Sequence, residues 1–181
     1  MPSIPHSPDL QSRAEAVRLV AFDIDGTLTD GRLVFDSEGR ELKAFHSQDG
    51  MGIALLVRHG FEVAFVTARE SRIVEARGRE LKVQHVFTGE KNKAGCIRAL
   101  AASLGLTLEQ VAFMGDDLPD LEVMRLVGLA AIPADAHACV KPIAHFAAQK
   151  AGGRGGAREL CDVLLAAHGF ADAIYNAGDA Q

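Results

Sequence analysis

One stretch decides the fold of this 181-residue chain: Val20-Ala-Phe-Asp-Ile-Asp-Gly-Thr-Leu-Thr-Asp-Gly31. The apolar run over residues 18–22 is typical of a short buried strand, and Asp23 and Asp25 follow it directly. Side chains two residues apart share one face of an extended chain, about 6.5–7 Å apart along it. The two carboxylates therefore point the same way, and a cation or a shared proton would relieve their repulsion. Gly26 allows a sharp turn there and leaves room for a ligand.

This arrangement suits phosphoryl transfer. The carboxylate of Asp23 could attack phosphorus and form an aspartyl-phosphate. The carboxyl group of Asp25 could protonate the leaving oxygen and then activate water for the second step. Magnesium would hold the phosphate against the first carboxylate and neutralise charge. An Asp-Gly pair alone indicates only a turn, but the complete string is far more specific.

Strands and helices alternate along the rest of the chain. We expect strands over 61–66, 83–87, 111–114, 129–132 and 145–147, and helices near 50–59, 70–81, 93–104, 121–127, 137–140 and 157–168. Such alternation predicts an α/β fold with a doubly wound parallel sheet. Right-handed crossovers would bring the carboxyl ends of all the strands to one edge, where ligands bind. Asp23, Asp25, Thr67 and Asp116 should therefore meet there.

A hairpin is predicted directly after the first strand. Two short β-prone runs within residues 32–46 flank Asp-Ser-Glu-Gly39, with Gly39 in a left-handed conformation. Phe35, Leu42 and Phe45 make this hairpin apolar, which favours a lid or an intersubunit role. The sequence between Asp30 and Asp49 has room for nothing more, so we expect no cap domain.

The domain organisation and composition indicate one globular unit. We expect a single domain over 15–170, a flexible arm over 1–14 and a flexible tail over 171–181. The chain is 48% hydrophobic and 24% charged, and its net charge of −5 argues against general nucleic-acid binding. There is no apolar run of membrane-spanning or signal-peptide length. The three cysteines are scattered, without the spacing of a metal site or a disulfide framework, so we expect a cytoplasmic protein.

Four further positions are candidates for the site. Thr67, between a strand and a helix, could bind a phosphate oxygen or merely cap the helix. Lys91 or Lys93, at the start of the next helix, could neutralise the nucleophile, although most lysines are solvated. The acids of Gly115-Asp-Asp-x-x-Asp120 are unfavourable together unless a cation or a helix N-terminus stabilises them. Arg154, in a glycine-rich loop, could bind a carboxylate or phosphate or belong to a flexible surface loop.

These motifs resemble those of the haloacid dehalogenase-like phosphohydrolases. The first motif matches Asp23-x-Asp25-Gly-Thr-Leu-Thr, which by resemblance makes Asp23 the nucleophile and Asp25 the general acid/base. The second matches Thr67-Ala-Arg69, and the lysine motif fits Gly89-x-x-x-Lys93 better than Lys91.

The fourth motif of that family matches Gly115-Asp116-Asp117. The resemblance implies that Mg²⁺ is bound by Asp23, by the backbone carbonyl of Asp25 and by Asp116. Asp117 would reach the metal through water or orient Lys93, and Asp120 could be only a helix-start residue. The candidate substrate contacts are Thr67, Lys93, Arg69, Gly26, Gln48 and Arg154.

Three further segments, 43–53, 134–137 and 152–155, look like those of the cap-less 3-deoxy-D-manno-octulosonate 8-phosphate phosphatase family. This resemblance implies a sugar-acid phosphate of lipopolysaccharide synthesis as substrate. It also implies a homotetramer joined through the hairpin at 33–46, in which a neighbouring subunit helps to close each site. The chain departs from the family at Gln48, where the family has Arg or Lys. A neutral amide binds a sugar-acid carboxylate less strongly than a cation does.

Three alternatives stay open. One is an inactive scaffold that kept the oligomer and lost catalysis, although all four motif positions are filled, which argues against it. The same chemistry could act on a nine-carbon sialic-type acid 9-phosphate, since the two substrates differ at the sugar and not at the phosphate. A phospho-acceptor receiver domain also combines clustered Asp with a Thr and a Lys. It would carry the phosphorylated Asp on a later strand and lack an acid two residues beyond it, so Asp25 favours turnover over storage.

Overall fold

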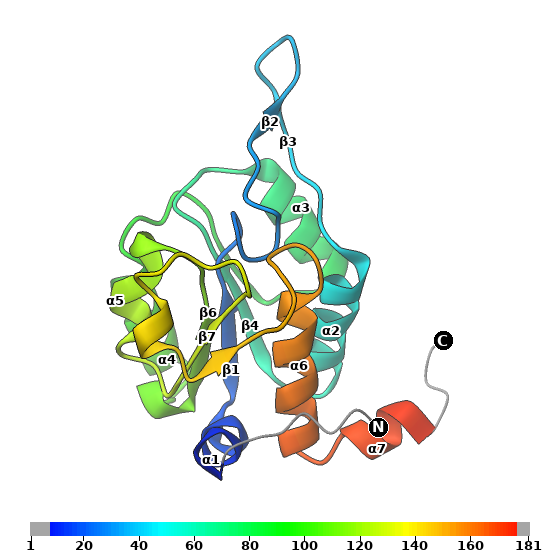
Figure 1. Ribbon diagram of the computed structural model, residues 1–181, viewed down its shortest axis with the longest axis vertical. Coiled ribbons are helices and arrows are strands. Elements are labelled where there is room, and N and C mark those ends of the chain that lie inside the picture. Colours follow the sequence, from blue (N-terminus) through cyan, green and yellow to red (C-terminus); the bar gives the residue numbers. More distant parts are fainter. Residues whose placement is uncertain (1–7, 177–181) are drawn as a thin grey trace.

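The computed structural model describes residues 8–176, and its centre is a six-stranded parallel sheet (Figure 1). The strand order is β5-β4-β1-β6-β7-β8. The strands are β1 (Leu19–Phe22), β4 (Glu62–Val66), β5 (His85–Phe87), β6 (Val111–Met114), β7 (Leu129–Ile132) and β8 (Phe146–Ala147). Every pair of neighbours in this sheet is parallel, which confirms the predicted doubly wound α/β fold.

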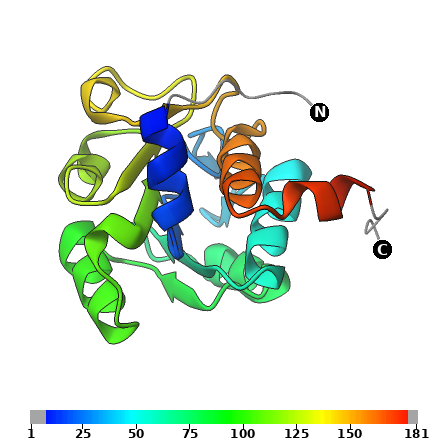
Figure 2. The ribbon, with the colours of Figure 1, turned by 90° about the horizontal axis from the view of Figure 1, so that it is seen from below.

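Helices cover both faces of the sheet, and the central strand β1 explains how. Its side chains alternate, so that Val20 and Phe22 join the core under one set of helices while Leu19 and Ala21 join the other. Figure 2 shows α2 and α6 on one side of the sheet and α4 and α5 on the other. The helices are α1 (Pro8–Ala16), α2 (Ser47–Arg58), α3 (Arg72–Leu81), α4 (Lys93–Ser103), α5 (Leu121–Met124), α6 (Gly156–Ala167) and α7 (Ala171–Asn176), with 3₁₀ turns at Leu108–Gln110, Leu118–Asp120 and Lys141–Ile143.

The strand order reverses at β1, which pairs with β4 on one side and β6 on the other. Phe22 is level with Phe65 of β4 and with Met114 of β6. Asp23, Thr67 and the loop after Met114 therefore leave the sheet at nearly the same height. Ligands of open α/β sheets bind at such a reversal, outside the carboxyl ends of the strands.

The predicted hairpin is formed by β2 (Val34–Phe35) and β3 (Glu41–Leu42), which pair antiparallel. It projects from the body at the carboxyl edge of the sheet, at the top of Figure 1. Gly39 has φ +76°, as expected, and the Asp36 carboxylate accepts the backbone N–H groups of Glu38 and Arg40. The described chain from Asp30 to Asp49 holds this hairpin and no cap domain.

Both ends of the described chain are more ordered than predicted. In place of a loose arm up to residue 14, α1 buries Leu10 and Ala14, and Arg13 donates a 2.7 Å hydrogen bond to the carbonyl of Gly128. In place of a flexible tail from 171, α7 packs Ile174 against the core. The packed chain therefore extends beyond 15–170 on both sides. The remainder of the arm and tail, 1–7 and 177–181, lies outside the described residues.

Some internal boundaries also differ from the predictions. The helix expected at 137–140 is wrong: these residues form turns, and the following Lys141–Ile143 is a 3₁₀ turn. The backbone N–H of His137 is instead hydrogen-bonded to the carbonyl of Asp116, at 2.8 Å. Helix α2 begins at Ser47 rather than near 50, so Gln48 and Asp49 lie in its first turn. Among the described residues, no helix combines the length and apolar character needed to cross a bilayer.

Candidate active site

Loops after β1, β4 and β6 and the start of α4 enclose one pocket at the carboxyl edge of the sheet. Its lining consists mainly of acidic and basic side chains, namely Asp23, Asp25, Thr67, Ala68, Arg69, Lys93, Asp116, Asp117, Pro119 and Asp120. The predicted convergence of these segments is therefore confirmed. Gln48 and Arg154 are described residues that do not line this pocket.

Asp23 and Lys93 form the buried centre of the pocket. The N–H of Asp23 donates to the carbonyl of Met114, which extends the sheet pairing by one residue. Its Oδ1 accepts a hydrogen bond of 2.5 Å from Nζ of Lys93. Lys93 is the first residue of α4, a helix capped by the side chain of Asn92, and it is buried, whereas Lys91 is exposed. The geometry thus places Lys93 rather than Lys91 against the predicted nucleophile.

Asp120 contributes more to the site than a helix-start residue would. Its Oδ1 accepts a hydrogen bond of 2.6 Å from Lys93, and its Oδ2 accepts the backbone N–H groups of Asp116 and Asp117. Asp120 therefore orients Lys93 and shapes the loop after β6. The alternative that Asp117 orients Lys93 is wrong, because Asp117 Oδ1 accepts the N–H of Leu118 at 2.7 Å and caps a 3₁₀ turn.

The pocket holds more negative charge than Lys93 can balance. Carboxylate oxygens of Asp23, Asp116 and Asp120 lie within 4.8 Å of one another. Burial and the neighbouring Asp120 raise the pKa of Asp23 to about 8, even though Lys93 opposes this shift. The same two causes raise the pKa of Asp116 to about 6. Desolvation opposes the charge of Lys93, but Asp23 and Asp120 outweigh it and raise the pKa of the ammonium group. A hard divalent cation with oxygen ligands fits this donor set.

Adding Mg²⁺ is accordingly expected to stabilise the folded protein. At about 100 times the dissociation constant the gain would be about 2.7 kcal/mol, or about 5–10 °C in Tm for a chain of this size. Thermal unfolding with Mg²⁺ and with chelator measures it. Asp116→Asn should lose most of the shift, and an equal shift in that variant would contradict the assignment of Asp116 as a ligand.

Asp25 is held by charged residues of the hairpin, which the sequence analysis did not single out. Its Oδ1 accepts a hydrogen bond from Nζ of Lys43, whose side chain is buried and also lies 3.2 Å from Glu41. Arg69 lies 3.1 Å from Glu41 and 3.9 Å from Asp25 Oδ2, an oxygen that is buried without a hydrogen-bond partner. Residues 41 and 43 are two apart, so an extended chain directs both toward one face. This spacing, and the resemblance of the segment that begins at Lys43, were the sequence signals for them.

Gly26 is required where the backbone approaches Asp116. It has φ +95°, and a Cβ there would lie 2.1 Å from Asp116 Oδ2. Asp116 also accepts the hydroxyl of Thr27 at 3.2 Å. The glycine-rich loop packs on the other side of the same turn, because a Cβ at Gly152 would lie 1.8 Å from the carbonyl oxygen of Gly26. This loop therefore packs closely against the turn that follows β1.

The other predicted contacts lie at varying distances from the centre. Thr67 is buried, and its hydroxyl accepts the N–H of Arg69 at 3.3 Å. Arg154 is exposed and forms a 3.2 Å ion pair with Asp30. Gln48 is exposed near Lys150: a Cβ at Gly155 would lie 3.5 Å from Gln48 Oε1 and 3.4 Å from Lys150 Nζ. The ammonium group of Lys150 therefore lies near the amide of Gln48.

Asp49, next to Gln48, has a structural role. It is buried, and its carboxylate accepts the N–H groups of Gly155, at 3.2 Å, and Arg158, at 2.8 Å. It therefore caps the N-terminus of α6 and ties α2 to the glycine-rich loop. Burial raises its pKa despite these two hydrogen bonds.

Comparisons with known proteins agree with this geometry. A family model for haloacid dehalogenase-like hydrolases matches residues 82–159. The 3-deoxy-D-manno-octulosonate 8-phosphate phosphatase of Escherichia coli BL21-DE3 is 42% identical over 168 residues, which cover 93% of this chain and 89% of that protein. A crystal structure from Xanthomonas campestris is 47% identical with a TM-score of 0.93, covering 99% of this chain and 97% of that one. The Moraxella catarrhalis 3-deoxy-D-manno-octulosonate 8-phosphate phosphatase, solved with magnesium, phosphate and KDO, is 34% identical with a TM-score of 0.93, covering 96% and 100%.

Proposed function

The chain belongs to the 3-deoxy-D-manno-octulosonate 8-phosphate phosphatase family of the haloacid dehalogenase-like hydrolases, and from this premise we propose its reaction and the residues that perform it. It is a magnesium-dependent phosphomonoesterase that converts 3-deoxy-D-manno-octulosonate 8-phosphate into the free sugar acid and phosphate. The residue assignment rests on the hydrogen bond from Lys93 to Asp23. Asp116 and Asp25, which follows Asp23 by two residues, line the same pocket.

In the first step the carboxylate of Asp23 attacks phosphorus, and the bond from phosphorus to the sugar oxygen breaks. Asp25 gives its proton to that oxygen, so the sugar leaves as an alcohol. Lys93 and the Thr67 hydroxyl bind phosphoryl oxygens and stabilise the charge that spreads over them in the transition state. The product of this step is an aspartyl-phosphate on Asp23.

In the second step water attacks the phosphorus of the aspartyl-phosphate. Asp25, now a carboxylate, takes the proton of that water as general base. Phosphate leaves and Asp23 is regenerated. Asp120 takes no part in bond making and acts as a positioning residue, because it touches Lys93 and the backbone after β6.

The residues that would hold Mg²⁺ are the carboxylates of Asp23 and Asp116 and the backbone carbonyl of Asp25, with Asp117 reaching it through water. When bound, the ion neutralises phosphate charge and orients it toward the nucleophile. Asp23 and Asp116 fit this role, since burial and a neighbouring carboxylate raise both pKa values when no cation is present.

Phosphate release from 3-deoxy-D-manno-octulosonate 8-phosphate tests the activity directly. It is to be measured with Mg²⁺ and with chelator, beside a sialic-type nine-carbon acid 9-phosphate. We expect metal-dependent release with a clear preference, in kcat/KM, for the eight-carbon substrate. A preference for the nine-carbon acid would overturn the substrate, and release that persists in chelator would overturn the metal-dependent mechanism.

Lys43 is expected to position the general acid/base. Lys43→Met removes the ammonium group that binds Asp25 Oδ1, so Asp25 loses its fixed orientation. We expect kcat to fall about 10–100-fold with a smaller change in KM, as general acid–base catalysis contributes about 10²–10⁴-fold in all. Lys43→Arg should recover part of the loss. Steady-state kinetics of the three proteins measure this, and an unchanged kcat in Lys43→Met would rule out the role.

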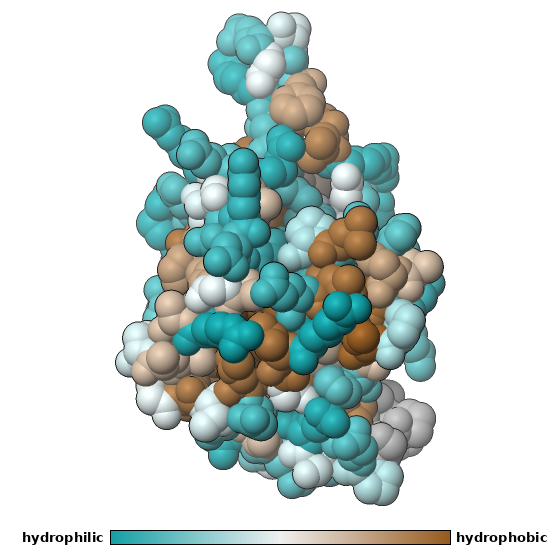
Figure 3. All heavy atoms as spheres, turned by 90° about the vertical axis from the view of Figure 1, so that its left-hand side faces the viewer, coloured by the Kyte–Doolittle hydropathy of each residue, from teal (hydrophilic) through white to brown (hydrophobic). Residues whose placement is uncertain are grey.

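We also propose that the chain forms a homotetramer in the cytoplasm through the hairpin at 33–46. The apolar side chains of this hairpin are about half exposed, namely Leu33, Val34, Phe35 and Leu42 at 49%, 48%, 51% and 55%. Figure 3 shows apolar atoms along the stalk of the hairpin beneath a hydrophilic tip. Such a patch on a projecting element supports burial against another copy of the chain.

Phe35→Asp is expected to break this assembly. A charge at the centre of the apolar patch would have to be buried without a partner, while the isolated fold would be unaffected, because Phe35 is exposed. Light scattering coupled to size exclusion should show a lower mass than for the wild type. Glu38→Ala, at the hydrophilic tip, serves as control and should keep the wild-type mass. A wild type that is itself monomeric would contradict the proposal.

A further inference from the structure

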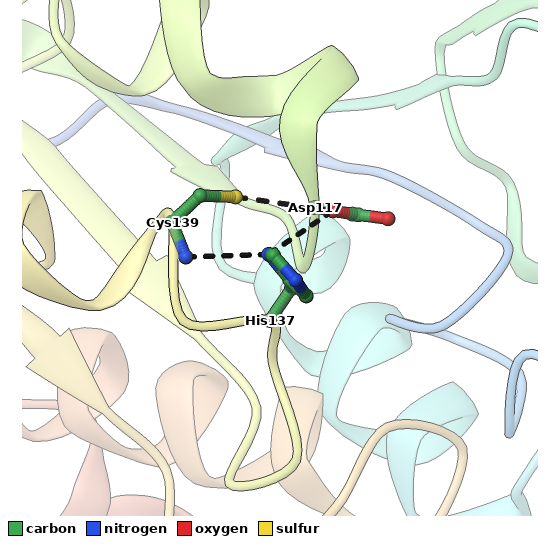
Figure 4. Close-up of side chains that lie close together, drawn as sticks. All are labelled: Asp117, His137 and Cys139. Atoms are coloured by element: carbon green, nitrogen blue, oxygen red, sulfur yellow. Dashed lines mark hydrogen bonds and ion pairs between the residues drawn. The ribbon is translucent and has the colours of Figure 1, made fainter.

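Three side chains with metal-binding atoms gather at the rim of the catalytic pocket, outside the carboxylate cluster around Lys93 (Figure 4). Asp117 belongs to the loop after β6, whereas His137 and Cys139 belong to the turns after β7. The hydrogen bond from the N–H of His137 to the carbonyl of Asp116 ties these two loops together. The spacing of the cysteines along the sequence does not predict this cluster, because Asp117 belongs to a different loop from His137 and Cys139.

Two of the three donor separations are close to those of a tetrahedral metal site, and the third, from His137 Nδ1 to Cys139 Sγ, is within 4.8 Å. Asp117 Oδ1 lies 3.6 Å from His137 Nδ1 and 3.8 Å from Cys139 Sγ. With zinc bonds of about 2.1 Å to oxygen and nitrogen and about 2.3 Å to sulfur, a tetrahedron requires about 3.4 Å between O and N and about 3.6 Å between O and S. Both observed distances exceed these values by about 0.2 Å, so small side-chain shifts would complete the geometry.

The nitrogen donor carries a free lone pair for a metal, and the cluster is accessible. The backbone N–H of Cys139 donates to His137 Nδ1 at 3.3 Å, which requires a lone pair and no proton on that nitrogen. A metal would displace this long hydrogen bond. The side chains of Asp117 and His137 are 53% and 61% exposed, so a metal can enter from solvent and keep a water as its fourth ligand. Desolvation and the neighbouring Asp117 raise the pKa of the Cys139 thiol in the metal-free protein, so this thiol gives its proton to solvent only as the metal binds and then acts as the thiolate ligand.

The donor chemistry separates this cluster from the magnesium site. Asp23, Asp116 and Asp120 offer oxygen alone, which suits Mg²⁺, whereas imidazole and thiolate select zinc and related transition metals. We propose that Asp117, His137 and Cys139 form a site for Zn²⁺ or Co²⁺ at the rim of the catalytic pocket. This site shares only Asp117 with the magnesium site, where Asp117 would act through water, and its existence does not depend on the substrate.

Cobalt binding in the presence of saturating Mg²⁺ tests the proposal on the full-length protein. Excess Mg²⁺ occupies the oxygen site, and a thiolate bound to Co²⁺ gives a sulfur-to-metal charge-transfer band in the near ultraviolet. We expect this band to appear in the wild type and to saturate at one Co²⁺ per chain. Zn²⁺ added afterwards should abolish it by displacing Co²⁺.

Variants identify the ligands. Cys139→Ser should show no charge-transfer band. In His137→Ala the band should no longer saturate at one Co²⁺ per chain. Cys96→Ser is the matched control and should keep the band, because Cys96 lies in α4, outside the cluster of Asp117, His137 and Cys139. Circular dichroism of each variant verifies the fold. The proposal is overturned if the wild type shows no band, or if the band persists in Cys139→Ser.

Discussion

Asp23→Asn is expected to abolish phosphate release, by about 10⁴-fold or more in kcat, while leaving the fold intact. An amide has nearly the shape of the carboxylate but cannot form the aspartyl-phosphate, so the two-step route is lost rather than slowed. The oxygen that accepts the hydrogen bond from Lys93 remains, and the backbone bond to Met114 is untouched. Steady-state phosphate release and mass spectrometry of the quenched enzyme measure the effect. Activity within tenfold of the wild type would exclude Asp23 as the nucleophile.

The same variant should change how stability depends on pH. Because the pKa of Asp23 is about 8 in the folded protein and 3.8 as a free group, the folded state holds an extra proton between these values. The free energy of unfolding of the metal-free wild type should therefore fall as pH rises from about 4 to 8, and Asp23→Asn should flatten this slope. Chemical unfolding in chelator at several pH values provides the measurement. An unchanged slope would show that Asp23 is not the group responsible.

Asp25→Asn is the natural companion. It keeps the nucleophile but lacks the base for the second step, so phosphorylated enzyme should accumulate where Asp23→Asn shows none. Accumulation in the wild type itself would instead favour the storage behaviour of a receiver domain.

Lys93→Met is the second variant with a large expected effect, on both activity and stability. Among the described residues, Lys93 is the side chain that gives a cation to Asp23 and Asp120 together. We expect kcat/KM to fall about 10²–10³-fold, the usual cost of losing a donor that stabilises transition-state charge. Breaking a buried ion pair costs about 3–5 kcal/mol, and protonation of the orphaned carboxyl groups should limit the loss here to about 5–10 °C in Tm.

Lys91→Met is the matched control for this experiment. Lys91 has the same charge and lies two residues away, but it is exposed outside the pocket. Its replacement should leave activity and Tm close to those of the wild type. If Lys91→Met were the damaging change and Lys93→Met the harmless one, the assignment of Lys93 would be reversed.

The N-terminal helix and the turns at 137–140 show why the local sequence pattern did not predict every secondary-structure element. The sequence predicts a flexible arm over residues 1–14, yet α1 is held by burial of Leu10 and by a hydrogen bond from Arg13 to Gly128, more than a hundred residues away. The turns at 137–140 stand in place of the expected helix, and the N–H of His137 is bound by the loop after β6. For α1, a partner remote in sequence decided the outcome.

By itself the sequence determined the parallel α/β fold, the hairpin, and the meeting of Asp23, Asp25, Thr67 and Asp116. These follow from strand periodicity and from the rule that parallel strands end at one edge, which are local or topological properties. Only the tertiary structure decided that Lys93 and not Lys91 faces Asp23, that Asp120 orients it, and that Lys43 reaches Asp25. Directions and burial of long side chains depend on packing among segments far apart in the chain. For the same reason, the sequence did not predict that Asp117, His137 and Cys139 lie close together.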